Sequence, residues 1–205
     1  ARGGGGRGCA GVGREAGGCS PEGGGRQSEY TVPLSYRDGA GEHPLITSAE
    51  ELLRQMAANP KGSYRLTEDL DASGLSDAAA AIAGTLSGEL DGNGHRILNL
   101  PTSLFQTLSG AYVHDLVIEN AQITTQRSGI LANVIQNQSV VERVFIVDSS
   151  ISNGVDQLGA FAGNLNNSTI RESASINVSV KGLVAVGGIV GKPNAAAWIE
   201  NCYAT

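Results

Sequence analysis

Cysteine, aromatic residues and charged residues are all scarce in this chain of 205 residues. Its three cysteines, Cys9, Cys19 and Cys202, form neither a disulfide framework nor the CxxC spacing of a metal site. Aromatic residues make up 4% and charged residues 17% of the chain, whereas glycine occurs 29 times. This composition disfavours a helical protein and is typical of a fold that is rich in small residues and turns.

The sequence also argues against two classes of partner, nucleic acid and the membrane interior. The net charge is -6 and basic residues do not cluster, so we do not expect the chain to bind nucleic acid. The longest apolar run, residues 183–191, is far shorter than the roughly 20 residues that cross a bilayer, so no membrane span is expected. No signal peptide is visible. Because the chain starts with alanine and stops inside a repeat, we expect it to be a piece of a longer polypeptide.

Residues 1–28 are rich in glycine and contain few apolar side chains. Twelve of these 28 residues are glycine, and Val12 is the largest apolar residue among them. Such a segment buries too little surface to offset the entropy lost on ordering. We predict a disordered Gly/Arg-rich head, either a linker or an artefact at the edge of a fragment. Only Arg2 begins an Arg-Gly-Gly triplet, which does not suggest an RNA-binding segment.

Residues 29–63 are predicted to form an extended lead-in and one short α-helix. Ser48 is a good N-cap, and Glu51 three residues later completes the pattern of a capping box. One face of this helix is apolar and carries Leu52, Leu53 and Met56. Asn59-Pro60 ends the helix. We expect this helix to cap the first turn of the repeat that follows.

The rest of the chain, residues 64–205, is dominated by an internal repeat. Similar phrases begin at Val113, Val141, Ile170 and Ile199, with spacings of 28, 29 and 29 residues. A second, glycine-rich phrase recurs at 128–133, 158–163 and 186–191. A fixed period of this length indicates one unit stacked on copies of itself. We predict an all-β fold, a right-handed parallel β-helix (solenoid) that is truncated at its C-terminus. A leucine-rich repeat is the competing fold, but the second half of each unit is not helical.

The repeat predicts columns of equivalent residues. The inward-facing residues of three successive copies are Val113, Leu116, Ile118 and Ile123; Val141, Val144, Ile146 and Ile151; and Ile170, Ser173, Ser175 and Val180. Asn120, Asp148 and Asn177 form another column. Because Asn and Asp tolerate left-handed backbone geometry, we interpret this column as a ladder of turns. A row of calcium ligands is the alternative, but it needs several carboxylates that converge on one point.

Three groupings of polar residues suggest chemistry, and a structural interpretation is preferred for each. His114 and Asp115 are adjacent on a strand, so their side chains should point to opposite faces, toward solvent, and should not pair as in a catalytic triad. Glu89, Asp91 and His95 surround a tight Asp-Gly-Asn-Gly turn without the spacing of a calcium loop.

The third grouping consists of two columns of mixed charge: Asp115, Arg143 and Glu172; and His114, Glu142, Arg171 and Glu200. Acidic and basic residues that converge on one outer face are also found in solenoids that cleave polysaccharides. Stacked charges of both signs are explained more simply as a solvent-facing surface with salt bridges.

Four phrases together resemble a known family: YRLTEDLDASGL from residue 64, GELDGNGHRILNL from residue 88, the pair GAFAGN and GGIVGK, and the final ENCYAT. They resemble the N-terminal, non-catalytic region of the IgA1-specific zinc metalloendopeptidases, which are large secreted or wall-attached bacterial enzymes. Gly-Ile-Val-Gly at 188–191 is also similar to the GLUG motif found in that region.

The resemblance implies a spacer or substrate-positioning segment of a secreted or cell-wall-associated bacterial virulence factor, whose full-length form acts on a host glycoprotein such as IgA1. The zinc of such enzymes is held by an HExxH helix. The three histidines, His43, His95 and His114, lack that spacing, so no catalytic, cofactor-binding or metal-ligating residue is assigned here. Zinc is expected in a separate catalytic domain. The alternative is a repeat region of a bacterial surface adhesin with no enzymatic activity.

Overall fold

The computed structural model describes residues 37–38, 41–42, 45–75, 83–153 and 156–205. All of them belong to the unit Pro33–Thr205. The predicted disordered head, residues 1–28, lies outside the described residues, as does His43. The predicted boundary between lead-in and repeats, at residues 63 and 64, stays a prediction.

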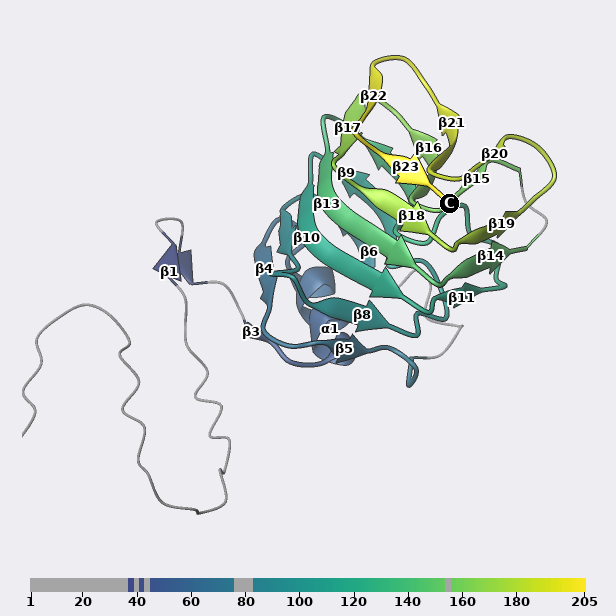
Figure 1. Ribbon diagram of the computed structural model, residues 1–205. Helices are drawn as coiled ribbons and strands as arrows, with labels where there is room; N and C mark the ends of the chain where they lie inside the picture. The colour runs from purple at the N-terminus through teal and green to yellow at the C-terminus, as the bar shows by residue number, and fades with distance from the viewer. Residues whose placement is uncertain (1–36, 39–40, 43–44, 76–82, 154–155) are drawn as a thin grey trace, which may run out of the picture. The chain divides into compact units, whose positions relative to one another are not determined.

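The chain folds as a parallel β-solenoid, which confirms the predicted fold class (Figure 1). Its largest sheet has eleven strands, and the seven strands of its main path run in the order β22-β17-β13-β10-β7-β4-β3. Their bounds are β3 Leu45–Ile46, β4 Ser63–Leu66, β7 Glu89–Asp91, β10 Tyr112–Glu119, β13 Val140–Val147, β17 Ser168–Arg171 and β22 Ala197–Glu200. The remaining four are β5 Leu70–Asp71, β8 Arg96–Leu98, β18 Ala174–Ile176 and β23 Tyr203–Ala204.

Three smaller parallel sheets form the other sides of the solenoid, and two of them are present in only some of the turns. The five-stranded sheet contains β6 Ala83–Leu86, β9 Phe105–Ser109, β12 Ala132–Gln136, β16 Ala162–Leu165 and β21 Val190–Pro193. A three-stranded sheet contains β11 Gln122–Ile123, β14 Ser150–Ser152 and β19 Ser179–Lys181, and a two-stranded sheet contains β15 Leu158–Gly159 and β20 Val186–Gly187. Separately, β1 Arg37–Asp38 and β2 Gly41–Glu42 form an antiparallel pair.

The predicted register is confirmed by the column of residues that open each repeat. Val113 pairs with Val141, Val141 with Ile170, and Ile170 with Ile199. The same column continues backward through Leu90 to Tyr64. From Tyr64 to Ile170 these side chains are buried, so each turn places one apolar residue above another in a continuous core.

Serine residues occupy two interior positions of the third regular turn. Ser173 and Ser175 are each 1% exposed, at positions where the preceding turn has Val144 and Ile146. The Ser173 hydroxyl accepts a hydrogen bond from the backbone N–H of Val144 and donates to the carbonyl of Arg171. The Ser175 hydroxyl donates to the carbonyl of Gly188. These bonds satisfy the buried hydroxyls, which makes polar residues tolerable inside the solenoid.

The predicted ladder of turns is confirmed. Asn120, Asp148 and Asn177 all have positive φ, of 56°, 46° and 53°, and Asn99 extends the column with 59°. The Asn120 amide donates to Asn99 Oδ1 over 2.6 Å, and the Asn177 amide donates to Asp148 Oδ1 over 2.6 Å. The side chains that accept left-handed geometry also link one turn of the solenoid to the next.

The described α-helix, α1 (Ala49–Ala58), covers the interior at the first turn, as predicted for a cap (Figure 1). The backbone N–H of Glu51 donates to the Ser48 hydroxyl over 3.1 Å, as in an N-cap. The Glu51 carboxylate accepts from the side chains of Thr47 and Gln55. The buried residues of the helix are Ala49, Leu52 and Met56, whereas Leu53 is only partly buried.

Candidate functional site

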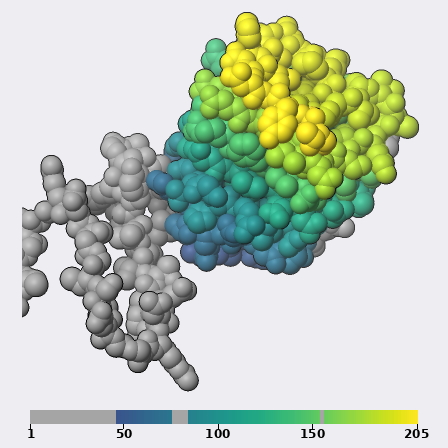
Figure 2. Space-filling model, viewed as in Figure 1, coloured from purple at the N-terminus to yellow at the C-terminus, as the bar shows by residue number. Residues whose placement is uncertain are grey.

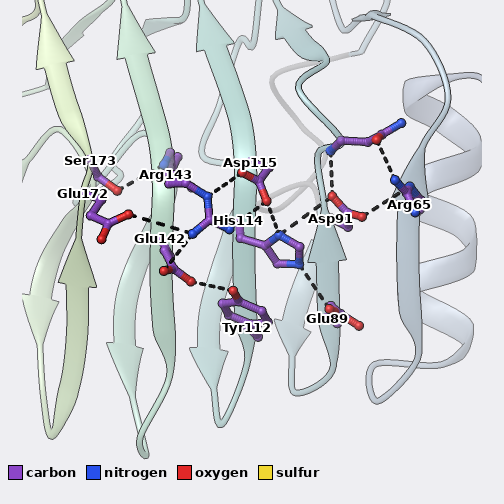
Figure 3. A network of polar contacts seen from close by, with 12 residues as sticks. Arg65, Glu89, Asp91, Tyr112, His114, Asp115, Glu142, Arg143, Glu172 and Ser173 are labelled. Atoms are coloured by element: carbon purple, nitrogen blue, oxygen red, sulfur yellow. Dashed lines mark hydrogen bonds and ion pairs between the residues drawn. The ribbon is translucent and has the colours of Figure 1, made fainter. Parts of the chain in front are cut away.

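A bend with left-handed backbone geometry interrupts the large sheet at the same place in successive turns. Asp115, Arg143, Glu172 and Asn201 lie at this bend, with φ of 52°, 50°, 50° and 51°. Cross-strand pairing continues on both sides of it, with His114 opposite Glu142 and Leu116 opposite Val144. Beside this bend, polar side chains from five successive turns form one network (Figure 3).

His114 and Asp115 lie at the centre of this network, and our expectation that they point apart is wrong. His114 Nδ1 is 2.7 Å from Asp115 Oδ2. The His114 side chain is only 12% exposed and stacks on Tyr112, with ring centroids 4.2 Å apart. Strict alternation of faces requires extended backbone at every residue, and the positive φ of Asp115 breaks it.

Two acidic residues of the preceding turn face the same imidazole ring (Figure 3). Glu89 Oε1 is 3.1 Å from His114 Nε2, and Asp91 Oδ1 is 3.8 Å from His114 Nδ1. The structure therefore brings Glu89 and Asp91 to His114, not to the nearby His95 that we considered. His95 instead faces Asp69, with Nδ1 and Oδ1 3.5 Å apart.

Arginine residues neutralise both aspartates of the network. Arg143 donates from Nε to Asp115 Oδ1 over 2.6 Å and from its terminal nitrogen to Oδ2 over 2.9 Å. This two-pronged contact is the main reason that the pKa of Asp115 falls to about 2, and His114 lowers it further. Asp91 Oδ2 lies 3.3 Å from Nε of Arg65.

Glu142 is the most buried carboxylate of the network, with a side chain that is 10% exposed. It accepts a hydrogen bond from the Tyr112 hydroxyl, and it lies 2.7 Å from Arg143 and 3.1 Å from Arg171. The pKa of Glu142 is lowered, first by the Tyr112 hydroxyl and then by the two guanidinium groups. The predicted mixed-charge columns are therefore linked by ion pairs, and Arg143 also approaches Glu172 at 3.9 Å.

Among the described residues of this network, His114 has no nucleophile beside it with which it could form a nucleophile–base pair. A triad histidine uses one ring nitrogen for an orienting acid and keeps the other for the nucleophile. In this chain Asp115 faces Nδ1 of His114 and Glu89 faces Nε2, so both nitrogens are occupied by carboxylates. The ring acts as a bridge between two turns of the solenoid.

A metal ion is the other chemistry that this cluster suggests. One ligand atom each from Asp91, His114 and Asp115 lie within 4.8 Å of one another, and imidazole with carboxylates suits divalent transition metals. However, Arg65 and Arg143 each hold one of the two aspartates. A cation would have to compete with these guanidinium groups, so we assign no metal site.

An open cavity of about 410 Å³ lies beside the network. Its lining residues are Arg65, Asp91, Asn93, Gly94, Asp115, Arg143 and Phe145, which come from four successive turns. The charges that line it are balanced, with two arginines and two aspartates already paired. The cavity is an open groove across the turns, in which the charged groups already pair with one another.

Comparison with known proteins identifies the family. Residues 37–148 match the M26 IgA1-specific metallo-endopeptidase N-terminal region. The chain belongs to this family. The match confirms the resemblance that the repeated phrases suggested.

The relatives that this chain matches are much longer than the chain itself. The chain is 30% identical to the immunoglobulin A1 protease of Streptococcus pneumoniae over 156 residues, which cover 72% of the chain and 8% of that protein. It is 26% identical to the zinc metalloprotease ZmpC of Streptococcus pneumoniae, over 82% of the chain and 10% of that protein. The chain thus spans about a tenth or less of the length of these relatives.

A solved structure described as an IgA1 protease shares the solenoid. It aligns with a TM-score of 0.67 and 26% identity, over 78% of this chain and 14% of the other. Within the residues that the structure describes, no helix has the length and hydrophobicity needed to cross a membrane. The described helix α1 of this M26 family member contains no histidine, so it is not an HExxH helix.

Proposed function

We propose that this chain is a non-catalytic β-solenoid of a secreted or cell-wall-associated bacterial zinc metalloendopeptidase of the IgA1-protease type. In that enzyme it acts as a spacer or as a substrate-positioning region. The observation that carries the proposal is the match of residues 37–148 to the N-terminal region of the M26 family. The zinc belongs to a separate HExxH domain, and the substrate of the full-length protein is IgA1.

The physical character of the solenoid supports this role. Turns stack at the spacing of parallel strands, about 4.8 Å, so each added turn lengthens the rod by a fixed amount. Ion pairs such as Arg143–Asp115 and side-chain hydrogen bonds such as the one from Asn120 to Asn99 connect successive turns on the outside of the rod. A rod that is stabilised by such contacts between its turns holds the attached domains at a defined distance and orientation.

The polar network supports a non-catalytic role as well. Both ring nitrogens of His114 face carboxylates, and the Asp115 carboxylate is held by Arg143. Groups that already bond to one another in the resting protein stabilise the fold and are poorly placed to activate a substrate.

Two experiments test the proposal. First, the gene is read beyond Thr205; we expect a downstream HExxH motif in the same reading frame. A reading frame with further repeats and a cell-wall anchor but no HExxH would indicate a surface binding protein instead. Second, the 205-residue chain is incubated with human IgA1, with and without zinc, and the products are analysed by electrophoresis. No cleavage is expected, and zinc-dependent cleavage by the chain alone would contradict the non-catalytic role.

A further inference from the structure

The groove beside the polar network has one polar side and one apolar side. Its polar side carries the carboxylates of Asp91 and Asp115. Its apolar side is formed by Phe145, which lies on the outer face of β13 between Val117 and Ala174 of the neighbouring turns. The volume of about 410 Å³ is within the range of sites that hold small molecules.

Phe145 is placed differently from the other phenylalanines of the chain. Of the three, Phe105 and Phe161 are fully buried in the interior, whereas Phe145 is only partly buried on the outside. Its ring therefore contributes little to the core of a chain that has few aromatic residues. An aromatic ring beside a small number of fixed polar groups is the usual lining of a ligand site.

The polar side of the groove offers hydrogen-bond acceptors that are held in place. Asp115 accepts two hydrogen bonds from Arg143, and its pKa of about 2 keeps it ionised at neutral pH. A carboxylate accepts about four hydrogen bonds, so Asp91 and Asp115 keep acceptor capacity after they pair with Arg65 and Arg143. Because a guanidinium group neutralises each of these carboxylates, the groove favours an uncharged ligand that donates hydrogen bonds.

The position of the groove argues against a peptide or a nucleic acid as its ligand. An extended peptide adds to a sheet at an exposed edge, but β7, β10 and β13 are each paired with a strand on both sides. A nucleic acid requires arginine or lysine side chains that reach its phosphates, and the arginines of the groove are held by aspartates. The groove is therefore suited to a ligand that only side chains contact.

We propose that the groove binds a neutral oligosaccharide of pyranose rings. Sugar hydroxyl groups donate to Asp91 and Asp115, and the apolar C–H face of one ring packs on Phe145. Figure 2 shows, in the view of Figure 1, how the turns succeed one another across the described surface, from blue to yellow. These turns are about 4.8 Å apart, close to the length of one sugar residue in an extended chain, so an oligosaccharide that crosses them meets groups from several turns.

Binding without cleavage is expected, because the carboxylates of the network are held by other side chains. Such groups accept hydrogen bonds from hydroxyl groups, but they are poorly placed to activate a glycosidic bond. The inference goes beyond the proposed role in a protease and does not depend on it, because it concerns only residues of this chain.

The test is titration of the 205-residue chain with defined oligosaccharides, followed by calorimetry. The neutral probes are chitotriose, which resembles the glycan of bacterial cell walls, and N-acetyllactosamine, which occurs on host glycoproteins. Trigalacturonate is the charged control. We expect at least one neutral probe to bind with a Kd of about 1 mM or tighter, and trigalacturonate to bind at least about tenfold more weakly. The preferred neutral probe distinguishes the two sources of the glycan.

Substitution of Phe145 tests the apolar side of the groove. Phe145→Ala should weaken binding of the preferred neutral probe at least about tenfold, whereas Phe145→Tyr keeps the ring and should bind within about twofold of the natural chain. The matched control is Val134→Ala, which shortens a partly buried apolar side chain on β12 in the five-stranded sheet and should leave the affinity unchanged. Circular dichroism verifies that each variant is folded.

Nuclear magnetic resonance of the natural chain locates the binding site without any substitution. The backbone amide signals of Gly94, Val117 and Phe145 should shift as the neutral probe is added, and that of Val134 should not. This measurement decides the proposal even where Phe145→Ala fails to fold. No binding of either neutral probe, tighter binding of trigalacturonate, unchanged affinity in folded Phe145→Ala, or signal shifts confined to other residues would each overturn the proposal.

Discussion

His114 and Asp115 are neighbours in the sequence, and their side chains form a 2.7 Å contact on the outside of the solenoid. The contact exists because the backbone of Asp115 is left-handed, with φ of 52°. Equivalent bends at Arg143 and Glu172 keep successive turns in register. One backbone feature thus sets both the path of the large sheet and the position of its polar network.

The bend predicts a graded response to substitution at Asp115. Asp115→Asn keeps a side chain that tolerates positive φ but loses the ion pair with Arg143, and it should cost about 1 kcal/mol of unfolding free energy. Asp115→Val also forces a β-branched residue into a left-handed conformation and should cost about 2–3 kcal/mol. Urea unfolding followed by circular dichroism measures both. Equal losses for the two variants would contradict the role of the backbone.

Acid should weaken the solenoid through its carboxylates of lowered pKa. The pKa of Asp115 is about 2 in the folded chain, below its ordinary 3.8. Its contribution to stability is therefore complete above about pH 4 and is lost as the pH falls toward 2. Because the side chain is 36% exposed, we expect this contribution to be about 1 kcal/mol and not the full value of the shift.

The measurement for the acid effect is the free energy of unfolding between pH 5 and pH 2, compared with Asp115→Asn. The variant should lose less stability over this range, because it has no carboxylate to protonate at that site. Glu142→Gln should act in the same direction, since the pKa of Glu142 is also lowered. Parallel pH profiles for the natural chain and Asp115→Asn would show that the ion pair of Asp115 with Arg143 contributes nothing to the acid sensitivity of the fold.

The interior column predicts that two adjacent residues of β13 contribute very different amounts to the free energy of unfolding. Ile146 is fully buried beneath Ile118, whereas Val147 is half-buried on the outer face. Ile146→Ala should cost about 2–5 kcal/mol, because it removes buried methyl groups and leaves a cavity. Val147→Ala should cost about 1 kcal/mol or less. Thermal and urea unfolding measure the stability that each variant loses. Similar losses for Ile146→Ala and Val147→Ala would contradict the register of β13.

The glycine-rich phrase predicts that close backbone packing is essential at one glycine and absent at another. A Cβ atom on Gly159 would lie 2.7 Å from the nitrogen of Gly191 and would also clash with the carbonyl oxygen of Ala162. Gly159→Ala should therefore destabilise the chain by about 2 kcal/mol or more. Gly84→Ala is the control, since nothing lies within 4 Å of its Cβ position. A stable Gly159→Ala variant would contradict the packing at this corner.

Much of the fold could be predicted because it depends on a translational repeat. The spacing of Val113, Val141, Ile170 and Ile199 determines which residues pair in parallel strands. The column of Asn120, Asp148 and Asn177 could be predicted because Asn and Asp favour left-handed turns wherever they occur.

The bend at Asp115 was missed, although the sequence contains a signal for it. Inward-facing residues are spaced by three and then by two in Val113-x-x-Leu116-x-Ile118, and an uninterrupted strand allows only spacings of two. One of the two intervening residues must therefore depart from extended geometry. The same spacing occurs in every later copy, which explains why Arg143, Glu172 and Asn201 have the same conformation.

By itself, the sequence determined the period, the parallel pairing and the identity of the buried columns, because these follow from the order and spacing of apolar residues along one chain. Only the tertiary structure decided which charged groups meet. His114 faces Glu89 and Asp91 across a turn that advances 23 residues from Leu90 to Val113, shorter than the later spacings of 28 and 29 residues. Contacts between side chains on adjacent turns depend on the length of each turn and on the backbone angle at its bend, and neither is set by the residues in contact.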